Sequence, residues 1–582
     1  MPRRASTVLS LLALCSALAC PPADAAVMLL RVGAGAQCDY RTDVLPNALQ
    51  SAIDAVPTSI PAGDAYVIRV ARSGNYSGVK LDLFNRGVII EGGYATCSSA
   101  TSDSTNTEID AAGAAAGPAL DIHGGSVRRN IVVRRLTVKN SDGGGLLVRS
   151  ADVRLERVTV TNNNAGNGGG IALIGGGQHA IVRLDGNSAV TDNTASLDGG
   201  GIHCSSGGEL YLASASSVVT NTAGLHGGGI MLDGCSAQIN SGATGLAGLF
   251  VNIGFNDAEM GGGIAVRSSG GGPGSSLTIG EALGSSDPRP LILNNEAGNQ
   301  GGGIFASGPQ TQVRIHDATV SNNTAASIGG GIMVRDGAVV EILRTRRRCG
   351  GAEECSLIVD NQADWGGGIS VVGDNAQVRV EGTRVEDNHA TAGGSAYFAM
   401  HRGAVLMSEN NVIVGNTGAS TVEISPGAGA APRVAEVHLL ADTIADNAGG
   451  AAVINANAEG RVVIARTIVN ASTSLPVLQR TGSGPQVQWS CNVLHVQTNV
   501  SDHDEQTSFT TAPGFINAAS GNYRLLVDAW AIDRCPSASG FRLFDHNINP
   551  RPVDSPHGNV AGPYDVGAYE WNSTLFEDGF ED

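Results

Sequence analysis

Asp198, His203 and His226 are the residues of this 582-residue chain whose types and spacing best suit chemistry. Asp198 and His226 each directly precede a run of three glycines, and His203 closely follows the first of these runs. Imidazole exchanges a proton near neutral pH, so a carboxylate beside it can support general acid–base catalysis. If the glycine runs mark equivalent positions of a repeat, these residues, with Asp233 nearby, form a candidate catalytic set.

Solvated turn residues are the alternative interpretation of the same positions, because clusters of titratable groups are often only structural. His389, His401 and Arg402 form a second, looser set of candidates. At the other glycine runs the preceding residue shows no common chemistry; it is Asn167, Met260, Gln300, Ile328 or Trp365.

The glycine runs belong to a repeat that must position these side chains. A second pattern, Val or Ile followed three positions later by Asn, precedes most of the runs. Two patterns in a fixed register are typical of a solenoid built from stacked coils. The motif Gly-Gly-Gly-Ile occurs seven times, at residues 168–171, 199–202, 227–230, 261–264, 301–304, 329–332 and 366–369.

The stretches between the motifs alternate apolar and polar residues, as in Val313-Arg314-Ile315. A period of two indicates half-buried strands, and each repeat has room for about three of them. No segment with a helical period is long enough for a βαβ unit. The sequence therefore predicts an all-β protein: a single-stranded right-handed parallel β-helix, or pectin-lyase-like solenoid, with a short N-terminal helical cap.

Two columns of residues should stabilise the stack. Isoleucines in register bury one side chain per coil, about 4.8 Å apart. Asparagines in register can hydrogen-bond along the axis and tolerate left-handed turn geometry. The residues expected in these columns are Ile171, Ile202, Ile230, Ile264, Ile304, Ile332 and Ile369, and Asn193, Asn221, Asn295, Asn323 and Asn361.

One position after each of these isoleucines, the alternation predicts a column that points away from the core. It contains His203, Met231, Phe305 and Met333 and no carboxylate, Lys or Arg. A flat apolar strip of this kind would dock the face of a glycan or a partner protein. The alternative is that long loops, such as residues 270–290, cover it.

The ends of the chain differ from the repeat. Residues 1–25 are expected to be a secretory signal peptide, although Cys20 could instead end a lipoprotein signal. Residues 26–125 should form an N-terminal cap and first coils, with an amphipathic helix through Leu45, Leu49, Ile53 and Val56. We assign residues 126–500 to the β-helix, 501–571 to a C-terminal cap and 572–582 to a tail.

Composition excludes several classes of function. The net charge of −18 disfavours nucleic acid and anionic membranes, and no run of 18 apolar residues predicts a transmembrane helix. Asp and Asn in turns could ligate calcium, but no calcium-loop motif occurs, so no metal or cofactor is predicted. The eight cysteines beyond the signal peptide allow 105 pairings. The simplest expectation is disulfides between sequence neighbours: Cys38–Cys97, Cys204–Cys235, Cys349–Cys355 and Cys491–Cys535.

The repeat resembles that of chlamydial polymorphic outer-membrane proteins, whose G-G-A-[ILV] and F-x-x-N motifs correspond to the two patterns above. Residues 513–570, with Asn-Tyr-Arg-Leu at 522–525 and Asp-Val-Gly-Ala-Tyr-Glu at 565–570, are similar to the ends of secreted bacterial β-helix proteins of the choice-of-anchor type. Residues 575–581 are similar to short tags of exported Gram-negative proteins. These resemblances imply a secreted protein or one on the outer-membrane surface of a Gram-negative bacterium.

Right-handed β-helices also include polysaccharide lyases and hydrolases. Neither lysine lies in the glycine repeat, and no Gly-His-Gly or Arg-Ile-Lys motif occurs. We therefore expect a monomeric protein that binds a glycan or a surface protein, an adhesin in its general class. The alternative is a polysaccharide lyase or glycoside hydrolase that acts on an acidic glycan through Asp198, His203 and His226 or through an arginine.

Overall fold

A computed structural model provides the structure of the chain. The expected signal peptide, the lipid alternative at Cys20 and the tail at 572–582 lie outside its described residues, as do Cys349, Cys355 and Arg402. It describes residues 26–571 except 61–63, 178, 214, 241–249, 269–271, 281–288, 345–355, 402, 426–433, 458–459, 472–474, 482–485, 496–507, 510, 537–543, 548 and 553–560.

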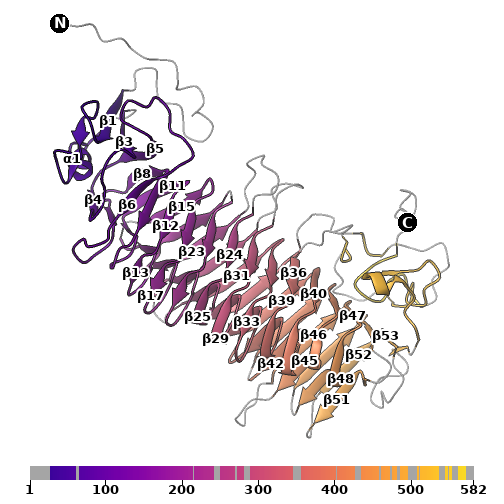
Figure 1. Cartoon of the computed structure of the whole chain (residues 1–582). Coiled ribbons are helices and arrows are strands. Elements are labelled where there is room, and N and C mark those ends of the chain that lie inside the picture. The colour runs from indigo at the N-terminus through magenta and orange to yellow at the C-terminus, as the bar shows by residue number, and fades with distance from the viewer. Residues whose placement is uncertain are drawn as a thin grey trace.

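The described chain is nearly all strand, wound into coils that stack as a long parallel β-helix (Figure 1). Three long parallel sheets, which we call A, B and C, run along its length. The strands of sheet A are β1 (Val27–Gly33), β2 (Tyr40–Arg41), β3 (Ala65–Ala71), β5 (Val88–Tyr94), β8 (Arg129–Arg134), β11 (Ala151–Glu156), β15 (Ile181–Asp185), β19 (Glu209–Leu212), β23 (Ser236–Ile239), β27 (Ser276–Ile279), β31 (Gln312–Ile315), β35 (Val339–Ile342), β39 (Gln377–Glu381), β43 (Val405–Glu409), β46 (Glu436–Leu440), β49 (Arg461–Ala465) and β52 (Gln486–Ser490).

Sheet B follows sheet A in each coil. Its strands are short, and those in the middle of the β-helix end at the turn that carries the recurring asparagine. They are β6 (Thr107–Asp110), β9 (Leu136–Lys139), β12 (Thr159–Thr161), β16 (Ala189–Thr191), β20 (Ser217–Val219), β24 (Asn252–Gly254), β28 (Leu291–Leu293), β32 (Thr319–Ser321), β36 (Ser356–Val359), β40 (Thr383–Glu386), β44 (Val412–Val414), β47 (Thr443–Ala445), β50 (Ile468–Asn470), β53 (Asn492–His495) and β54 (Ser508–Phe509).

Sheet C contains two families of strands separated by the glycine runs. The strands after the runs, with their equivalents at both ends, are β4 (Leu81–Phe84), β7 (Leu120–His123), β10 (Leu146–Arg149), β14 (Ile171–Ile174), β18 (Ile202–Ser205), β22 (Ile230–Asp233), β26 (Ile264–Arg267), β30 (Ile304–Ser307), β34 (Ile332–Arg335), β38 (Ile369–Val372), β42 (Tyr397–Met400), β45 (Thr417–Ser425), β48 (Ala448–Asn457) and β51 (Leu478–Thr481). The strands before the runs are β13 (Asn164–Ala165), β17 (Thr194–Ala195), β21 (Thr222–Ala223), β25 (Asp257–Met260), β29 (Glu296–Gln300), β33 (Thr324–Ala325), β37 (Gln362–Trp365) and β41 (His389–Gly393).

The asparagine ladder runs along the axis from Asn163 to Asn447. In a typical step, the backbone N–H and the side-chain Nδ2 of Asn193 both donate to Oδ1 of Asn221, each at 3.0 Å. The left-handed turn geometry belongs to the preceding residue and not to the ladder asparagine, as Asp192 shows with its φ of 56°. The expectation that the ladder asparagine adopts this geometry is therefore wrong.

The glycine runs are needed for two different reasons. Gly199, the first of its run, has a φ of 68°, a conformation that favours glycine. A Cβ on Gly201, the third, would lie 2.7 Å from the carbonyl oxygen of Gly229 and 2.9 Å from Nδ2 of Asn221. The runs thus allow neighbouring coils to approach closely, and the isoleucine that follows each run is fully buried.

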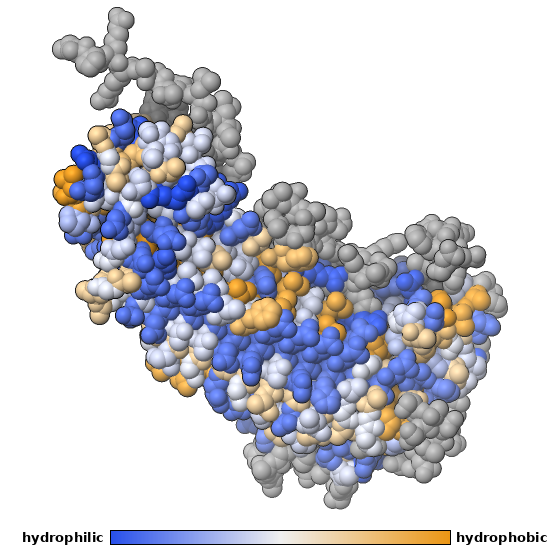
Figure 2. Space-filling view, viewed as in Figure 1, coloured by the Kyte–Doolittle hydropathy of each residue, from blue (hydrophilic) through white to orange (hydrophobic). Residues whose placement is uncertain are grey.

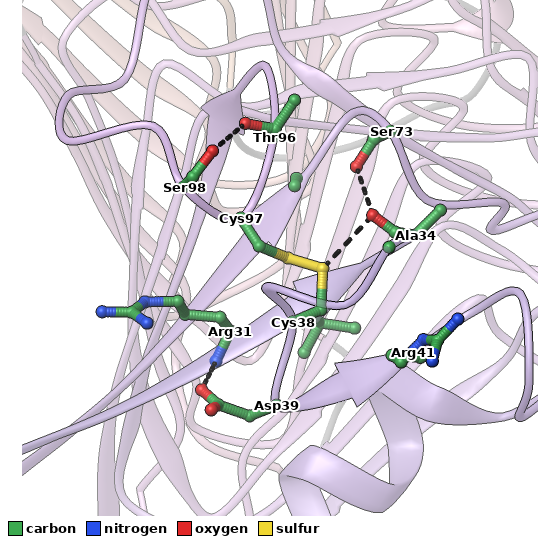
Figure 3. The surroundings of a disulfide bond; sticks show 12 residues. Arg31, Ala34, Cys38, Asp39, Arg41, Ser73, Thr96, Cys97 and Ser98 are labelled. Atoms are coloured by element: carbon green, nitrogen blue, oxygen red, sulfur yellow. Dashed lines mark hydrogen bonds between the residues drawn. A yellow bond between two sulfur atoms is a disulfide. The ribbon is translucent and has the colours of Figure 1, made fainter.

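Helix α1 (Ala48–Asp54) packs on the first strands at the N-terminal end of the β-helix. Its buried face includes Leu49 and Ile53, while Leu45 precedes the helix and is exposed. Figure 3 shows the disulfide Cys38–Cys97, which joins two loops of this region. The other disulfides are Cys204–Cys235 and Cys491–Cys535, so three of the expected neighbouring pairs are present.

The C-terminal segment, with β55 (Phe515–Asn517), η1 (Ala518–Ser520) and β56 (Asn522–Leu525), lies beside the last coils near β40 and β47 (Figure 1). Tyr523 and Tyr569 pack against Val412 and Val414 on the outer side of sheet B. Arg551 and Glu570 form a fully buried ion pair within the segment. Among the described residues, no helix has the length and apolar character needed to cross a bilayer.

Candidate functional site

Asp198 and His226 lie next to each other on adjacent coils, where they pair as parallel bridge residues directly before their glycine runs. Nδ1 of His226 is 2.7 Å from Oδ1 of Asp198, and each side chain is 15% exposed. The repeat creates this contact, because it places the residue before each run at the same position of successive coils.

A third coil extends the pair into a chain of charges. Arg267, the last residue of β26, places Nη2 3.1 Å from Oδ2 of Asp233 and 3.7 Å from Oδ2 of Asp198. The guanidinium therefore bridges two carboxylates that belong to different coils. Sequence reasoning missed Arg267, although Asp233 and Arg267 each stand three residues after a recurring isoleucine.

His203 lies on the outer side of β18 beside the same cluster. Burial lowers the pKa of its imidazole, and Arg267 adds to this effect, while the carboxylates of Asp198 and Asp233 oppose it. For Asp198, burial alone would raise the pKa of the carboxyl. The hydrogen bond with His226 and the charge of Arg267 outweigh burial, so this pKa lies below its usual value.

The cluster can carry out proton transfer. At neutral pH, Asp198 is ionised and orients His226 through Nδ1, and His203 is uncharged and able to accept a proton. No described residue hydrogen-bonds to Nε2 of His226. The structure thus brings together the three sequence candidates, and within its described part no group of His, Cys, Asp and Glu forms a metal site.

The remaining candidates do not join this cluster. His389 lies five coils away along sheet C and contacts Oγ1 of Thr417 through Nδ1 at 3.0 Å. His401 adopts a left-handed conformation at the end of its strand, with a φ of 73°. Arg344 also lies outside this cluster, with only 7% of its side chain exposed, beside Glu381.

The expected apolar strip is not free to bind a partner. Met231 and Met333 are fully buried, and Phe305 is 3% exposed. They form an apolar cluster outside the β-helix lumen with Phe398 of the next coils. The expectation of an open docking strip is therefore wrong for these three residues, whereas Ala172 and His203 of that column keep partial exposure.

Residues just before the glycine runs cover this strip. Met260, Ile328 and Trp365 pack on the cluster, and they belong to the same column as Asp198 and His226. The first glycine of each run folds the chain back over the strand that follows it. Three of the five residues that showed no common chemistry therefore share a structural task, which is to shield a second apolar core.

Sheet A offers an open outward face. Along β23, β31 and β39, exposed or half-buried side chains alternate with buried ones. Figure 2 shows a band of hydrophilic residues along the flank of the β-helix that faces the viewer. Arg183 lies over the ring of Tyr211, 4.4 Å from its centroid. One outward residue per coil forms the column that we call the A-face column: Arg154, Arg183, Tyr211, Gln238, Thr278, Arg314, Glu341, Arg379, Met407, His438, Val463 and Gln488.

The fold places this chain in the class of parallel β-helix solenoids. No family of known proteins matches the chain, and no curated protein is similar to it at a significant level. The resemblance to polymorphic outer-membrane proteins therefore rests on the repeat motifs alone, and the activity of the protein has to be argued from its surfaces.

Proposed function

We propose that this protein is an exported β-helical binding protein that holds a glycan polymer along the A-face column. The observation that supports the proposal is the continuity of this column, which offers one outward side chain per coil through twelve register-paired strands. Parallel strands repeat at about 4.8 Å, a spacing comparable with the length of one sugar unit.

The chemistry of the column favours a glycan over a protein partner. Protein interfaces depend on apolar anchors at their centre. The apolar residues of the expected strip, Met231, Phe305 and Met333, are buried, and only Met407 and Val463 of the A-face column lack a polar group. Guanidinium, amide and hydroxyl groups such as those of Arg314, Gln238 and Thr278 instead suit the hydroxyl groups of a sugar chain.

Export is part of the proposal. The signal peptide expected at residues 1–25 supports it, and so do the three disulfides, since such bonds persist in oxidising compartments. Display on the outer-membrane surface of a Gram-negative bacterium, as an adhesin, rests on the resemblance of the repeat and of the C-terminal motifs.

Binding of soluble neutral and acidic polysaccharides by the purified mature protein tests the proposal. The double variant Tyr211→Ala and Arg314→Ala should weaken binding at least about tenfold, which corresponds to about 1.4 kcal/mol. Thr194→Ala and Thr222→Ala, on the outer side of sheet C, form the matched control pair and should bind like the wild type. An equal loss of polysaccharide binding in the two double variants, or no binding of any polysaccharide by the wild type, would contradict the proposal.

Glycan cleavage at the cluster around His226 is the second candidate function. The assembly of Asp198, His203 and Arg267 beside His226 supports it. A lyase would yield an ultraviolet-absorbing unsaturated product, and a hydrolase would yield new reducing ends. His203→Ala and His226→Ala should abolish either signal, whereas His179→Ala, an exposed histidine on a neighbouring coil, should not. Turnover that survives both variants would exclude the cluster as its site.

A further inference from the structure

A polar cleft of about 330 Å³ opens in the N-terminal coils, far along the chain from both surfaces described above. One wall is the loop after β3, with Arg72, Asn75 and Ser77, and the other is the start of sheet B, with Glu108 and Asp110. A cavity of this size lies at the small end of the range for ligand sites. It can hold a single small polar molecule.

The two walls are held in place before any ligand arrives. Arg72 donates from Nη1 and Nη2 to the two carboxylate oxygens of Asp103, at 2.5 and 2.7 Å, and from Nη1 to the carbonyl oxygen of Thr105 at 3.0 Å. The hydroxyl of Tyr76 donates to the carbonyl oxygen of Ala71 at 2.9 Å. Little ordering is therefore required on binding, which favours affinity.

The disulfide of this region supports the same wall. The carbonyl oxygen of Ala34 accepts a hydrogen bond from the hydroxyl of Ser73, next to the cleft, and lies 3.4 Å from Sγ of Cys38 (Figure 3). Cys38 is bonded to Cys97, so the loop that carries Asn75 and Ser77 packs on a covalently closed base.

Several polar atoms of the cleft lack partners among the described residues. Oδ1 of Asp110 accepts from Nδ2 of Asn140 at 2.9 Å, but no described residue donates to its Oδ2. Nδ2 of Asn106 donates to the carbonyl oxygens of Leu136 and Arg157, so its Oδ1 remains as a further acceptor. The hydroxyl of Ser77 and Nδ2 of Asn75 are equally uncommitted, so the cleft offers both donors and acceptors.

We propose that this cleft binds one neutral saccharide unit. Sugar hydroxyls donate and accept hydrogen bonds, and they can satisfy the carboxylate of Asp110 and the amides of Asn75 and Asn106 together. An anionic ligand is disfavoured, because Glu108 and Asp110 are acidic and Arg72 is already paired with Asp103. An apolar ligand would find little surface, since the ring of Tyr76 is buried. This site goes beyond the proposed function, which concerns a polymer on sheet A.

Ligand-observed NMR and calorimetry on the full mature chain test this site with D-glucose, D-galactose, D-mannose and N-acetyl-D-glucosamine. At least one should bind saturably, and Asp110→Asn should weaken it about tenfold, because one acceptor of the carboxylate becomes a donor. Asp82→Asn, which removes an exposed carboxylate on β4, should leave binding unchanged. Ser77→Ala is a second variant of the cleft. Because Ser77 is exposed at the rim, this substitution should not impair folding.

Separate titrations with D-galacturonate and with calcium chloride distinguish other occupants. Tighter binding of galacturonate than of every neutral sugar, or calcium binding that Asp110→Asn removes, would overturn the proposal, as would the failure of all four neutral sugars. The sheet A variant with Tyr211→Ala and Arg314→Ala should keep full monosaccharide binding. Loss of polysaccharide binding on sheet A can therefore be distinguished from loss of monosaccharide binding in the cleft.

Discussion

The indole of Trp365 packs against the phenyl ring of Phe398 with ring centroids 5.1 Å apart, although the two residues belong to successive coils. This contact lies outside the lumen of the β-helix, in the cluster that also contains Phe305 and Met333. The solenoid thus has a second, thin apolar core between the strands of sheet C and the residues that precede the glycine runs. Coils are joined there by side-chain packing as well as by backbone hydrogen bonds.

Phe305→Ala should destabilise the protein by about 3–5 kcal/mol, because it removes a buried ring from this second core and leaves a cavity. Chemical denaturation of the purified variant measures the change. Phe255→Ala is the matched control, since this ring is 56% exposed and its loss should cost within about 0.5 kcal/mol. Equal stability of the two variants would show that the cluster does not contribute to folding.

Asn323→Ala should lower the free energy of unfolding by about 2–5 kcal/mol, because it leaves polar groups on both neighbouring coils without hydrogen-bond partners. Asn323 accepts from the backbone N–H and from Nδ2 of Asn295, and its own Nδ2 donates to Oδ1 of Asn361. The adjacent residue Asn322 is exposed with a φ of 54°, so Asn322→Gly should be nearly neutral. The midpoint of thermal unfolding compares the two, and a larger loss in Asn322→Gly would refute the ladder as a source of stability.

Much of this architecture could be predicted from the sequence, because the repeat acts locally and identically in each coil. A glycine run, an isoleucine such as Ile304 and an asparagine such as Asn323 recur in one register, and stacking is the arrangement that buries them all. The same logic placed Asp198 beside His226, since both hold the position before a glycine run.

The burial of the outward strip could not be read from alternation. A period of two tells which side of a strand a residue faces, but not whether the chain folds back over that side. Met260 precedes Ala265 by five residues and covers it only because Gly261, with a φ of 67°, reverses the chain. The ion pair between Arg267 and Asp233, by contrast, follows from the repeat, because both residues stand three positions after a recurring isoleucine.

Asp442→Asn should reduce the pH dependence of stability between about pH 4 and pH 8. Burial raises the pKa of Asp442 from 3.8 to about 8, so the folded state binds its proton more tightly than the unfolded state. The stability from this group is present below pH 3.8 and is lost as pH rises through 8. Asparagine keeps the acceptor for the backbone N–H of Asn411. Urea midpoints across this range check the prediction, and an unchanged slope would contradict it.

Acid should loosen the C-terminal segment from the last coils. Burial lowers the pKa of His546 to about 4, so its stabilising effect is present above pH 6.5 and is lost as pH falls toward 4. Its Nδ1 contacts the carbonyl oxygen of Asn410 at 2.9 Å, while Nε2 is buried without a partner among the described residues. A charged ring would leave that second N–H unsatisfied beside Arg344 and Arg384.

Limited proteolysis at pH 7 and at pH 4.5 tests this effect, with cleavage near residues 511–571 expected only at the lower pH. The variant His546→Gln, which does not titrate, should resist cleavage better than the wild type at low pH. Equal cleavage of the two proteins would assign the acid sensitivity to another group.

The length dependence of glycan affinity tests the central claim, which is that a polymer lies along the A-face column. Oligosaccharides of one to eight units, taken from a polysaccharide that binds, are titrated into the mature protein by calorimetry. Affinity should rise with each added unit over several coils, because every coil adds one contact to a single extended site. An affinity that stops rising after one unit, or that is unchanged in the Tyr211→Ala and Arg314→Ala variant, would contradict the claim.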